Sequence, residues 1–188
     1  IQTLDDSDSN IENAIDSQES QDAEAFYKAL YTDALTGAYN RRYYEEHLKK
    51  RVMSAGVAMF DLDDFKLAND TYGHDIGDRI LKTEVSVILN LIRKTDSLVR
   101  IGGDEFAVLM CDITSMENAL VKAGQICSLY TKGAAKEGLK ISCSIGMVFC
   151  ESDDGAAFDD LYQKADSALY KAKGKGKNVF VVFDENML

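Results

Sequence analysis

The order of hydrophobic and polar residues predicts alternating helices and strands after a polar start. Residues 1–25 show only a weak helical stripe, whereas residues 23–35 carry apolar positions at helical spacing. Residues 40–53 are typical of a helix of mixed charge. A short apolar run at 57–60 ends abruptly in acidic residues, as a buried strand does when it enters a turn. A long helix is expected over 77–93, where the apolar positions form one wide face.

The second half of the chain contains the clearest local signal. Two strand-like runs at 97–101 and 106–110 are separated by Gly-Gly-Asp-Glu, and paired glycines supply the positive φ angles of tight hairpins. A capping box at 114–117 then predicts a helix to about residue 131. The remaining expected elements are a strand at 139–150, a helix through 158–169 and a last strand at 179–183.

This order of elements predicts an α+β fold. Helices that cover one face of a largely antiparallel sheet are the simplest arrangement for it. A chain of 188 residues suits one globular domain with a short extension, and it begins at Ile1, which indicates a piece of something longer. No apolar run approaches the length of a membrane span.

The charge distribution argues against a nucleic-acid partner. The net charge is -11, and residues 1–25 contain eight acidic residues and no Lys or Arg. Without them the rest of the chain carries a charge of about -3, which offers no broad basic face for duplex DNA. A phosphate-bearing ligand therefore requires local lysines or metal ions.

The cysteines favour reduced, structural thiols and a cytoplasmic location, either of a free protein or of the cytoplasmic part of a larger membrane-anchored one. No pair has C-x-x-C spacing and both His residues are isolated, so zinc-ligand spacing is absent. Three of the four lie in apolar runs, where a free cysteine behaves as a small buried hydrophobe. The four cysteines are Cys111, Cys127, Cys143 and Cys150.

Two acidic turns contain candidate metal ligands. An Asp-Leu-Asp-Asp run at 61–64 follows the strand at 57–60, and Asp104 and Glu105 lie in the hairpin. If the strands are neighbours, Asp61 and Asp104 converge at one rim of the sheet. Such an oxygen-only site suits Mg²⁺ that shares ligands with substrate phosphates. Acidic residues also decorate turns in most proteins, and the residues alone leave both interpretations open.

Lysines near these turns are candidates for phosphate binding. Lys66 follows the first turn, where residues 64–66 begin a helix whose N–H groups are suited to an anion. Lys173 and Lys177 lie together at the end of the last long helix. Taken alone, this pair is better explained as the ordinary solvated end of a helix.

Five blocks of sequence resemble, in order and spacing, the GGDEF family of diguanylate cyclases. The signature Gly-Gly-Asp-Glu-Phe is intact at 102–106, and the resemblance extends from Asp33 to about Phe183. A lone signature is a weak signal, whereas five ordered blocks are a specific one. The other four are D-A-L-T-G with N-R-R (33–42), F-D-L-D-D-F-K with N-D (60–70), Y-G-H with G-D (72–78), and A-D-S-A-L-Y-K-A-K with Gly176 and Asn178.

The resemblance implies a palm-like fold of the nucleotidyl-cyclase and polymerase type, mainly antiparallel and flanked by helices, over 33–188 after an acidic leader, 1–32. It implies that Asp61, the carbonyl of Leu62 and Asp104 hold two Mg²⁺ or Mn²⁺ ions against GTP. The 3′-hydroxyl of one GTP then attacks the α-phosphate of another, with Asp104 or Glu105 as the proton acceptor. Without metal, repulsion between the two aspartates should raise at least one pKa.

The same resemblance implies how GTP is bound. Asn69 and Asp78 match the guanine-reading pair, since an aspartate accepts from guanine N1–H and its exocyclic amine. Lys177 stands where many members have Arg, which replaces a bidentate phosphate grip by a point charge. The remaining implied substrate contacts are Lys66, the backbone N–H groups of Asp64 and Phe65, His74 in the pocket and Lys173 on the triphosphate.

Members of the family act as homodimers in which each protomer holds one GTP, so proximity of two half-sites drives the reaction. The leader is where other members attach sensor or receiver domains, which would be missing from this piece. Arg93 and Asp96 form an R-x-x-D placed as in the family's product-inhibition site for cyclic di-GMP. Arg93 as a plain helix cap is the alternative.

Three other functions compete with the cyclase. The chain is alternatively a catalytically weak module that senses GTP or cyclic di-GMP, or a structural dimerisation domain with a vestigial motif. Both are disfavoured because Asp61, Lys66, Asp104, Glu105 and Lys173 are all present. A polymerase-like enzyme would require a basic template channel, which this acidic chain lacks.

Overall fold

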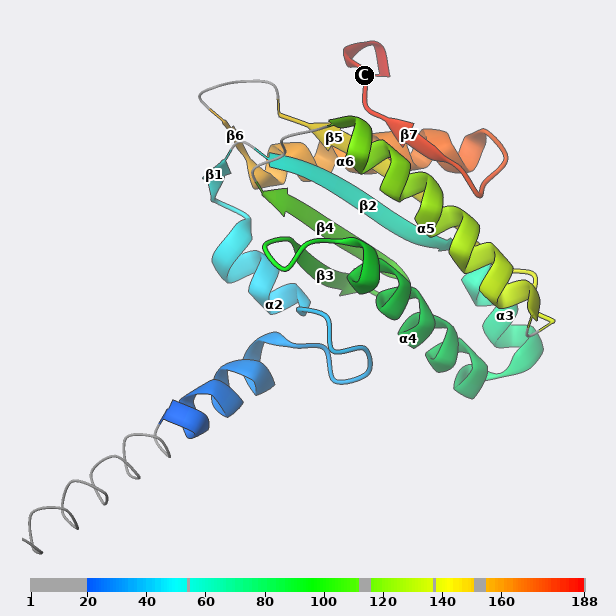
Figure 1. Ribbon diagram of the computed structural model, residues 1–188, viewed down its shortest axis with the longest axis horizontal. Coiled ribbons are helices and arrows are strands. Elements are labelled where there is room, and N and C mark those ends of the chain that lie inside the picture. The colour runs from blue at the N-terminus through cyan, green and yellow to red at the C-terminus, as the bar shows by residue number, and fades with distance from the viewer. Residues whose placement is uncertain (1–19, 54, 112–115, 137, 151–154, 188) are drawn as a thin grey trace, which may run out of the picture.

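A five-stranded sheet forms the centre of the computed structural model, which describes residues 20–53, 55–111, 116–136, 138–150 and 155–187. The strand order is β3-β4-β2-β5-β7, and every neighbouring pair is antiparallel except β5 and β7 (Figure 1). The strands are β2 (Ala55–Asp63), β3 (Ser97–Gly102), β4 (Glu105–Cys111), β5 (Ser142–Phe149) and β7 (Phe180–Val182).

Helices cover both faces of this sheet. In Figure 1, α4 (His74–Leu91) and α5 (Met116–Lys136) lie in front of the strands and α6 (Phe158–Gly174) lies behind them. The α+β class with a mainly antiparallel sheet is confirmed, but the expectation that helices cover only one face is wrong. The reason is that all nine residues of β2 are buried, so both of its faces require a covering layer.

Two hydrophobic clusters fill the layers on either side of β2. Phe60 and Leu62 pack with the buried face of α4 and α5, whereas Val57 and Met59 pack with α6. Gly146 in β5 permits close approach of α6, because a Cβ there would lie 2.1 Å from the backbone oxygen of Ala165. The tight packing on both faces holds the end of β2 in a fixed position.

The expected helix over 40–53 is wrong beyond its first two turns. The chain forms α2 (Arg41–Tyr43) and the π-helical turn η1 (Tyr44–Leu48), and then β1 (Val52–Met53), which pairs with β6 (Ala156–Ala157). Within residues 41–48, only the side chains of Tyr44 and Leu48 are buried, which is too short a stripe to hold a longer helix on the domain. The two further short helices are α3 (Phe65–Tyr72) and η2 (Glu185–Met187).

The described part of the segment before the sheet is a helix over 20–31, which is exposed as far as residue 29 and extends away from the domain in Figure 1. It ends earlier than the expected 23–35, because residues 32–40 turn back along the free edge of β3. Tyr39 N donates to Leu98 O at 2.9 Å, and Arg100 N donates to Tyr39 O at 2.7 Å. Residues 1–19, and residues 114 and 115 of the expected capping box, lie outside the described residues.

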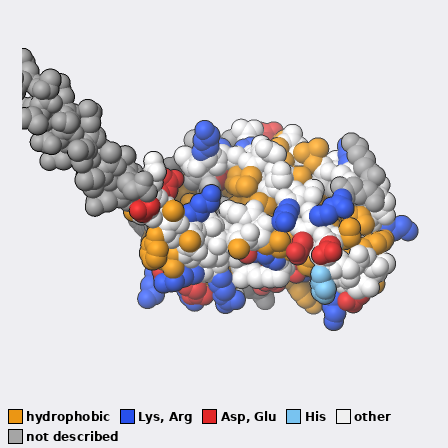
Figure 2. Space-filling model, turned by 90° about the horizontal axis from the view of Figure 1, so that it is seen from below, with side chains coloured by type: hydrophobic (Ala, Val, Ile, Leu, Met, Phe, Trp, Pro, Cys, Tyr) orange, Lys and Arg blue, Asp and Glu red, His pale blue; other side chains and the backbone are white. Residues whose placement is uncertain are grey.

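The surface contains both signs of charge. On the face shown in Figure 2, Lys and Arg side chains are interspersed with Asp and Glu, and no continuous basic surface is visible over its described part. None of the described helices combines the length and the apolar character required to cross a membrane. The four cysteines are free thiols.

Candidate active site

The end of β2 and the β3–β4 hairpin together form an acidic rim of the sheet. Asp61 lies opposite Glu105 of β4 and opposite Ser144 of β5 in the strand register. Asp104 occupies the turn between β3 and β4, next to Gly103, whose φ of 54° suits glycine. The structure therefore brings the two sequence-predicted acidic turns together at neighbouring strand ends, as expected.

Burial and charge give the rim acids unusual pKa values. Asp61 is only 6% exposed. Burial, together with repulsion from Asp104, raises its pKa to about 6, although the Lys173 ammonium, 2.8 Å from Asp61 Oδ1, opposes the rise. Burial also raises the pKa of Asp104. The expected rise is confirmed, but burial contributes more to it than the repulsion between the two aspartates.

Arg100 fixes the shape of the hairpin. Its Nε and Nη2 donate to the carbonyl of Gly103 at 3.0 and 2.7 Å, and its Nη1 donates to Asp33 at 3.0 Å. Asp33 also accepts from the backbone N and the hydroxyl of Thr36. The segment before the sheet is thereby tied to the turn that carries Asp104. The sequence offered no local signal for this role of Arg100, because its carboxylate partner lies 67 residues away.

Asp63 is an anchor of the rim that the sequence reasoning missed. Its carboxylate is buried and accepts from Ser142 Oγ at 2.6 Å, Ser144 Oγ at 2.7 Å and Asn178 N at 3.0 Å. Hydrogen bonds to a carboxylate offset its desolvation. Asp63 thus joins the end of β2 to β5 and to the loop after α6, and it holds Leu62 between two fixed neighbours.

A group of cationic and N–H donors lies beside the rim. Asp64 has a left-handed backbone with φ 60°, and Phe65 begins α3 immediately after it. Lys177 Nζ lies 2.7 Å from Asp64 Oδ1, and Lys177 itself has a positive φ of 65°. Together with Lys173 on Asp61, this places two lysines against the acidic end of β2. Lys66 is exposed in the first turn of α3.

The predicted guanine-reading residues lie where α3 meets α4. Asn69 Oδ1 is buried and has no hydrogen-bond partner among the described residues. Gly77 makes room for it, because a Cβ at Gly77 would lie 1.8 Å from Asn69 Oδ1. Asp78 and His74 are exposed in the first turns of α4. An orphaned buried acceptor beside an exposed carboxylate is consistent with a ligand that supplies N–H donors.

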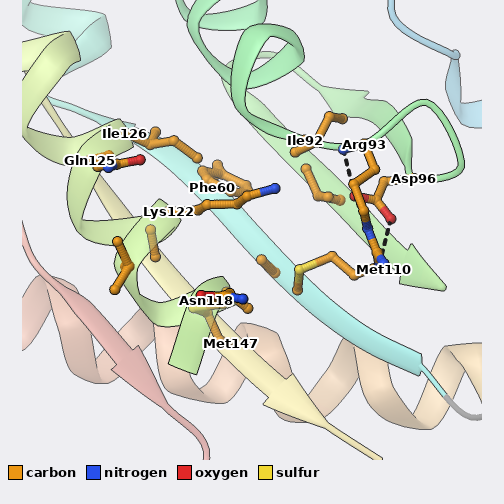
Figure 3. A pocket seen from close by; sticks show the side chains of 15 residues that line it. Phe60, Ile92, Arg93, Asp96, Met110, Asn118, Lys122, Gln125, Ile126 and Met147 are labelled. Atoms are coloured by element: carbon orange, nitrogen blue, oxygen red, sulfur yellow. Dashed lines mark hydrogen bonds and ion pairs between the residues drawn. The ribbon is translucent and has the colours of Figure 1, made fainter. Parts of the chain in front are cut away.

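Arg93 and Asp96 lie at the other end of α4, roughly 20 Å from Asp78 along the helix. Asp96 accepts from the backbone N of Arg93 at 2.8 Å and lies 3.3 Å from Arg93 Nη2. Arg93 Nη2 also donates to the carbonyl of Cys111 at 2.6 Å. As Figure 3 shows, the pair lies at one side of a largely apolar cavity of about 320 Å³, with Lys122 extending over Phe60 from the opposite side.

The rim offers a small set of oxygen ligands for a metal. Among the described residues, no group of three or more His, Cys, Asp and Glu side chains converges as a metal site. The set implied by the resemblance has another composition, namely the carboxylates of Asp61 and Asp104 and the carbonyl of Leu62. Hard divalent cations accept such ligands, and they would relieve the repulsion that contributes to the raised pKa of Asp61. The residues therefore fit a divalent cation.

These features define an α+β domain with an acidic rim, lysines beside it and a buried acceptor, Asn69 Oδ1, that has no partner among the described residues. The family model described as "Diguanylate cyclase, GGDEF domain" matches residues 30–179. The chain belongs to this GGDEF family, which confirms the resemblance.

Individual relatives agree with this assignment. The chain is 38% identical over 159 residues to Diguanylate cyclase DgcS of Shewanella oneidensis, covering 79% of this chain and 51% of that protein. It is 36% identical to Response regulator PleD of Caulobacter vibrioides, covering 80% of this chain and 35% of that protein. The chain thus spans about half or less of these curated relatives.

The solved structures show the same fold. The GGDEF domain of PA1120 (TpbB or YfiN) from Pseudomonas aeruginosa PAO1 is 30% identical to the chain, with a TM-score of 0.73. The match covers 84% of this chain and 96% of that one. The palm-like fold expected for residues 33–188 agrees with the fold of this GGDEF domain.

Proposed function

We propose that the domain is a diguanylate cyclase, which condenses two GTP molecules into cyclic di-GMP and releases pyrophosphate. One observation carries the proposal: the buried Asp61 and the turn residue Asp104 lie at neighbouring strand ends. Converging carboxylates with a nearby lysine are suited to a cation-bound triphosphate. The domain so described extends over 33–188, after the leader at 1–32.

The residues divide the work as follows. Asn69 and Asp78 bind the guanine edge, which favours GTP over ATP because adenine cannot donate to both acceptors. Lys66, Lys173 and Lys177 bind phosphate oxygens, together with the N–H groups of Asp64 and Phe65 at the start of α3. His74 lines the substrate pocket beside Asp78.

Asp61, the Leu62 carbonyl and Asp104 would hold two Mg²⁺ or Mn²⁺ ions. When bound, such ions neutralise charge on the phosphates and acidify the attacking hydroxyl. The reaction forms a bond between the 3′-oxygen of one GTP and the α-phosphorus of the other, and it breaks the bond from that phosphorus to the pyrophosphate oxygen. Asp104 or Glu105 takes the hydroxyl proton. The exposed side chain of Glu105 lies opposite Asp61, which supports it as a candidate.

Each domain holds one GTP in this scheme, so two copies must face one another. A homodimer raises the effective concentration of the second nucleotide, which is the main contribution to the rate. The helix at 20–31, which extends away from the domain, is suited to connect it to an upstream sensor or receiver domain. We place the domain in the cytoplasm, where GTP is available.

We also propose that Arg93 and Asp96 form a product-inhibition site for cyclic di-GMP. The exposed guanidinium of Arg93 can pair with a phosphate, whereas the Asp96 side chain is 3% exposed and must release Arg93 before it accepts from guanine. Their mutual contacts also stabilise the turn after α4, as a helix cap would. An Arg93→Ala variant should therefore need a much higher cyclic di-GMP concentration for half-inhibition of the cyclase. Unchanged inhibition would leave Arg93 as a cap only.

One observation favours the alternative of a weak module that senses GTP or cyclic di-GMP. Lys173 Nζ lies 2.8 Å from Asp61 Oδ1, where it competes with a cation for the same carboxylate. A domain that kept this ion pair in the presence of nucleotide would bind GTP without turning it over. The activity assay separates the two functions.

The test is incubation of the purified protein with GTP and Mg²⁺, followed by chromatography for cyclic di-GMP and pyrophosphate. Asp104→Ala should abolish the product, while Asp160→Ala, which removes an exposed acid from the first turn of α6, should not. Product that survives Asp104→Ala would indicate a contaminant or a wrong site. GTP binding without any product would identify the sensor.

A further inference from the structure

Two buried cysteines face one another behind the acidic rim. Cys127 lies in α5 and Cys143 in β5, and Cys127 Sγ is 3.6 Å from the carbonyl oxygen of Cys143. Both are free thiols. The other two cysteines, Cys111 and Cys150, are half-buried at the far ends of β4 and β5. Only Cys127 and Cys143 belong to the same hydrophobic cluster between α5 and the sheet.

The two thiols are chemically unequal. A hydrogen bond from the Cys143 thiol lowers the pKa of Cys127, against the opposing effect of burial. The same hydrogen bond and then burial raise the pKa of Cys143 well above its ordinary value. A thiolate is the nucleophile in cysteine chemistry. The roles follow from accessibility: Cys127 is 6% exposed and Cys143 is 0% exposed, so Cys127 is the sulfur placed to meet an oxidant and Cys143 the one placed to resolve it.

Cys127 is also the thiol that a small molecule can approach. It is 6% exposed and lines an open cavity of about 490 Å³ between α5 and the start of β7. Lys132 and Asn178 line the same cavity. A hydroperoxide is small enough to enter a space of this size, and it needs only one accessible sulfur atom to react.

We propose that Cys127 is an oxidation site for hydroperoxides and that Cys143 resolves the oxidised form as an intramolecular disulfide. The site belongs to neither the nucleotide pocket nor the Arg93–Asp96 pair. The oxidation itself does not rest on the cyclase proposal, whereas its effect on turnover does.

The chemistry balances with a hydroperoxide as the oxidant. The Cys127 thiolate attacks the outer peroxide oxygen, the O–O bond breaks, and Cys127 becomes a sulfenic acid while the peroxide leaves as an alcohol or water. The Cys143 sulfur then attacks the Cys127 sulfur, the S–O bond breaks, and water leaves with the thiol proton. Overall, two thiols lose two electrons and two protons, and one hydroperoxide is reduced.

The disulfide would act on the rim through β5. Cys143 lies opposite Leu62 in the strand register, and its two neighbours, Ser142 and Ser144, both donate to Asp63. A sulfur–sulfur bond of about 2.05 Å draws α5 and β5 together. Asn178, which lines the cavity over Cys127, donates its backbone N to Asp63 as well. Closure of the disulfide therefore strains three of the contacts that position the end of β2.

The test uses the whole chain in a Cys111→Ala/Cys150→Ala background, which leaves only the proposed pair. Treatment with hydrogen peroxide should decrease the intact mass by two hydrogen atoms, and dithiothreitol should reverse the change. In the triple variant that also carries Cys143→Ala, a dimedone adduct should form on Cys127. An unchanged mass, or irreversible oxygen addition alone, would overturn the proposal, as would a dimedone adduct confined to Cys111 and Cys150 in the natural sequence.

The effect on function is measured separately. Cyclic di-GMP synthesis by the Cys111→Ala/Cys150→Ala protein should fall on the order of tenfold on oxidation and recover on reduction, since a displacement near 1 Å can cost more than that. Addition of Cys127→Ala should remove the sensitivity, and Cys127→Ser provides a second variant if alanine impairs folding. A disulfide that forms without any change in a working cyclase would overturn the regulatory step. An inactive cyclase would leave the mass result intact.

Discussion

Glu84 lies in the middle of α4 and is 0% exposed, and neither of its carboxyl oxygens has a hydrogen-bond partner among the described residues. Its neighbours on the buried face of the helix are Ile80, Leu81, Val85 and Ile88. Burial first, and then repulsion from the carboxylates of the acidic rim, raises its pKa well above the ordinary value of 4.5. Glu84 is therefore a buried carboxylic acid that resists ionisation.

The sign of its effect on stability follows from this raised pKa. Between the unfolded pKa of about 4.3 and the raised folded one, the folded protein binds more protons than the unfolded chain. The stabilising contribution is therefore fully present below the unfolded pKa, and it is lost as the pH rises through the folded pKa. The slope over that window approaches about 1.4 kcal/mol per pH unit for this one group.

The perturbation is Glu84→Leu, which replaces the orphaned carboxyl by an apolar group of similar size. Removal of an unsatisfied buried polar group should raise the free energy of unfolding by about 1–3 kcal/mol near neutral pH. For a domain of this length, that corresponds to a melting temperature higher by about 2 to 12 °C. Glu84→Gln is the matched control, since it removes the ionisation but keeps a polar group in the core.

The assay is urea unfolding followed by circular dichroism at about pH 5.5 and about pH 8. The gain from Glu84→Leu should be larger at the higher pH, and Glu84→Gln should reproduce the change with pH but only part of the gain. Asp61 also has a raised pKa, so its titration changes the free energy of unfolding with pH in the same direction. Asp61 is present in every variant, so subtracting the value for the natural chain removes its contribution. A Leu variant that is less stable than the natural chain at the higher pH would refute the reasoning, because it would reveal a partner for Glu84.

Three further predictions concern the rim and its supports. Arg100→Lys should lower cyclase activity by on the order of tenfold, because a single ammonium cannot bind both the Gly103 carbonyl and Asp33; near-normal activity would contradict this. Gly77→Ala should displace Asn69 and raise the KM for GTP, while kcat changes less. Steady-state kinetics would measure both constants, with Gly174→Ala as the control because Gly174 has open space around it. Asp63→Asn should lower the free energy of unfolding by about 1–3 kcal/mol in urea, because the amide cannot accept from three donors.

The sequence predicted the position of β2 but not where it ends. The apolar run at 57–60 was enough to place a buried central strand, since no polar residue interrupts it. The strand continues to Asp63, because the charges at 61–63 are compensated within the fold. Asp63 depends on Ser142, Ser144 and Asn178, which are 79 to 115 residues away, and no local pattern reports contacts of that range.

The candidate site was also predictable only in part. Asp61, Asp104, Lys173 and Lys177 are predicted from the family resemblance, because the family's chemistry requires those residue types in that order. Arg100 and Gly77 were missed, since one acts through backbone carbonyls and the other by lacking a Cβ. The sequence predicts that Glu84 lies in the helix over 77–93, but it does not indicate that the side chain is buried. Only the packing of α4 on the sheet shows that this carboxyl has no partner in the described part of the chain.

Under the proposed function, the ion pair between Lys173 and Asp61 is expected to couple the binding of nucleotide to the binding of cation. Lys173 is 2.8 Å from Asp61, and a triphosphate that binds the same ammonium weakens this ion pair. Without that partner, Asp61 would be a buried carboxylate with a still higher pKa, close to the carboxyl groups of Asp104 and Glu84. An unpaired buried charge of this kind is costly. A divalent cation on Asp61 removes this cost. The nucleotide releases the lysine and the cation replaces it, so each ligand should bind more tightly in the presence of the other.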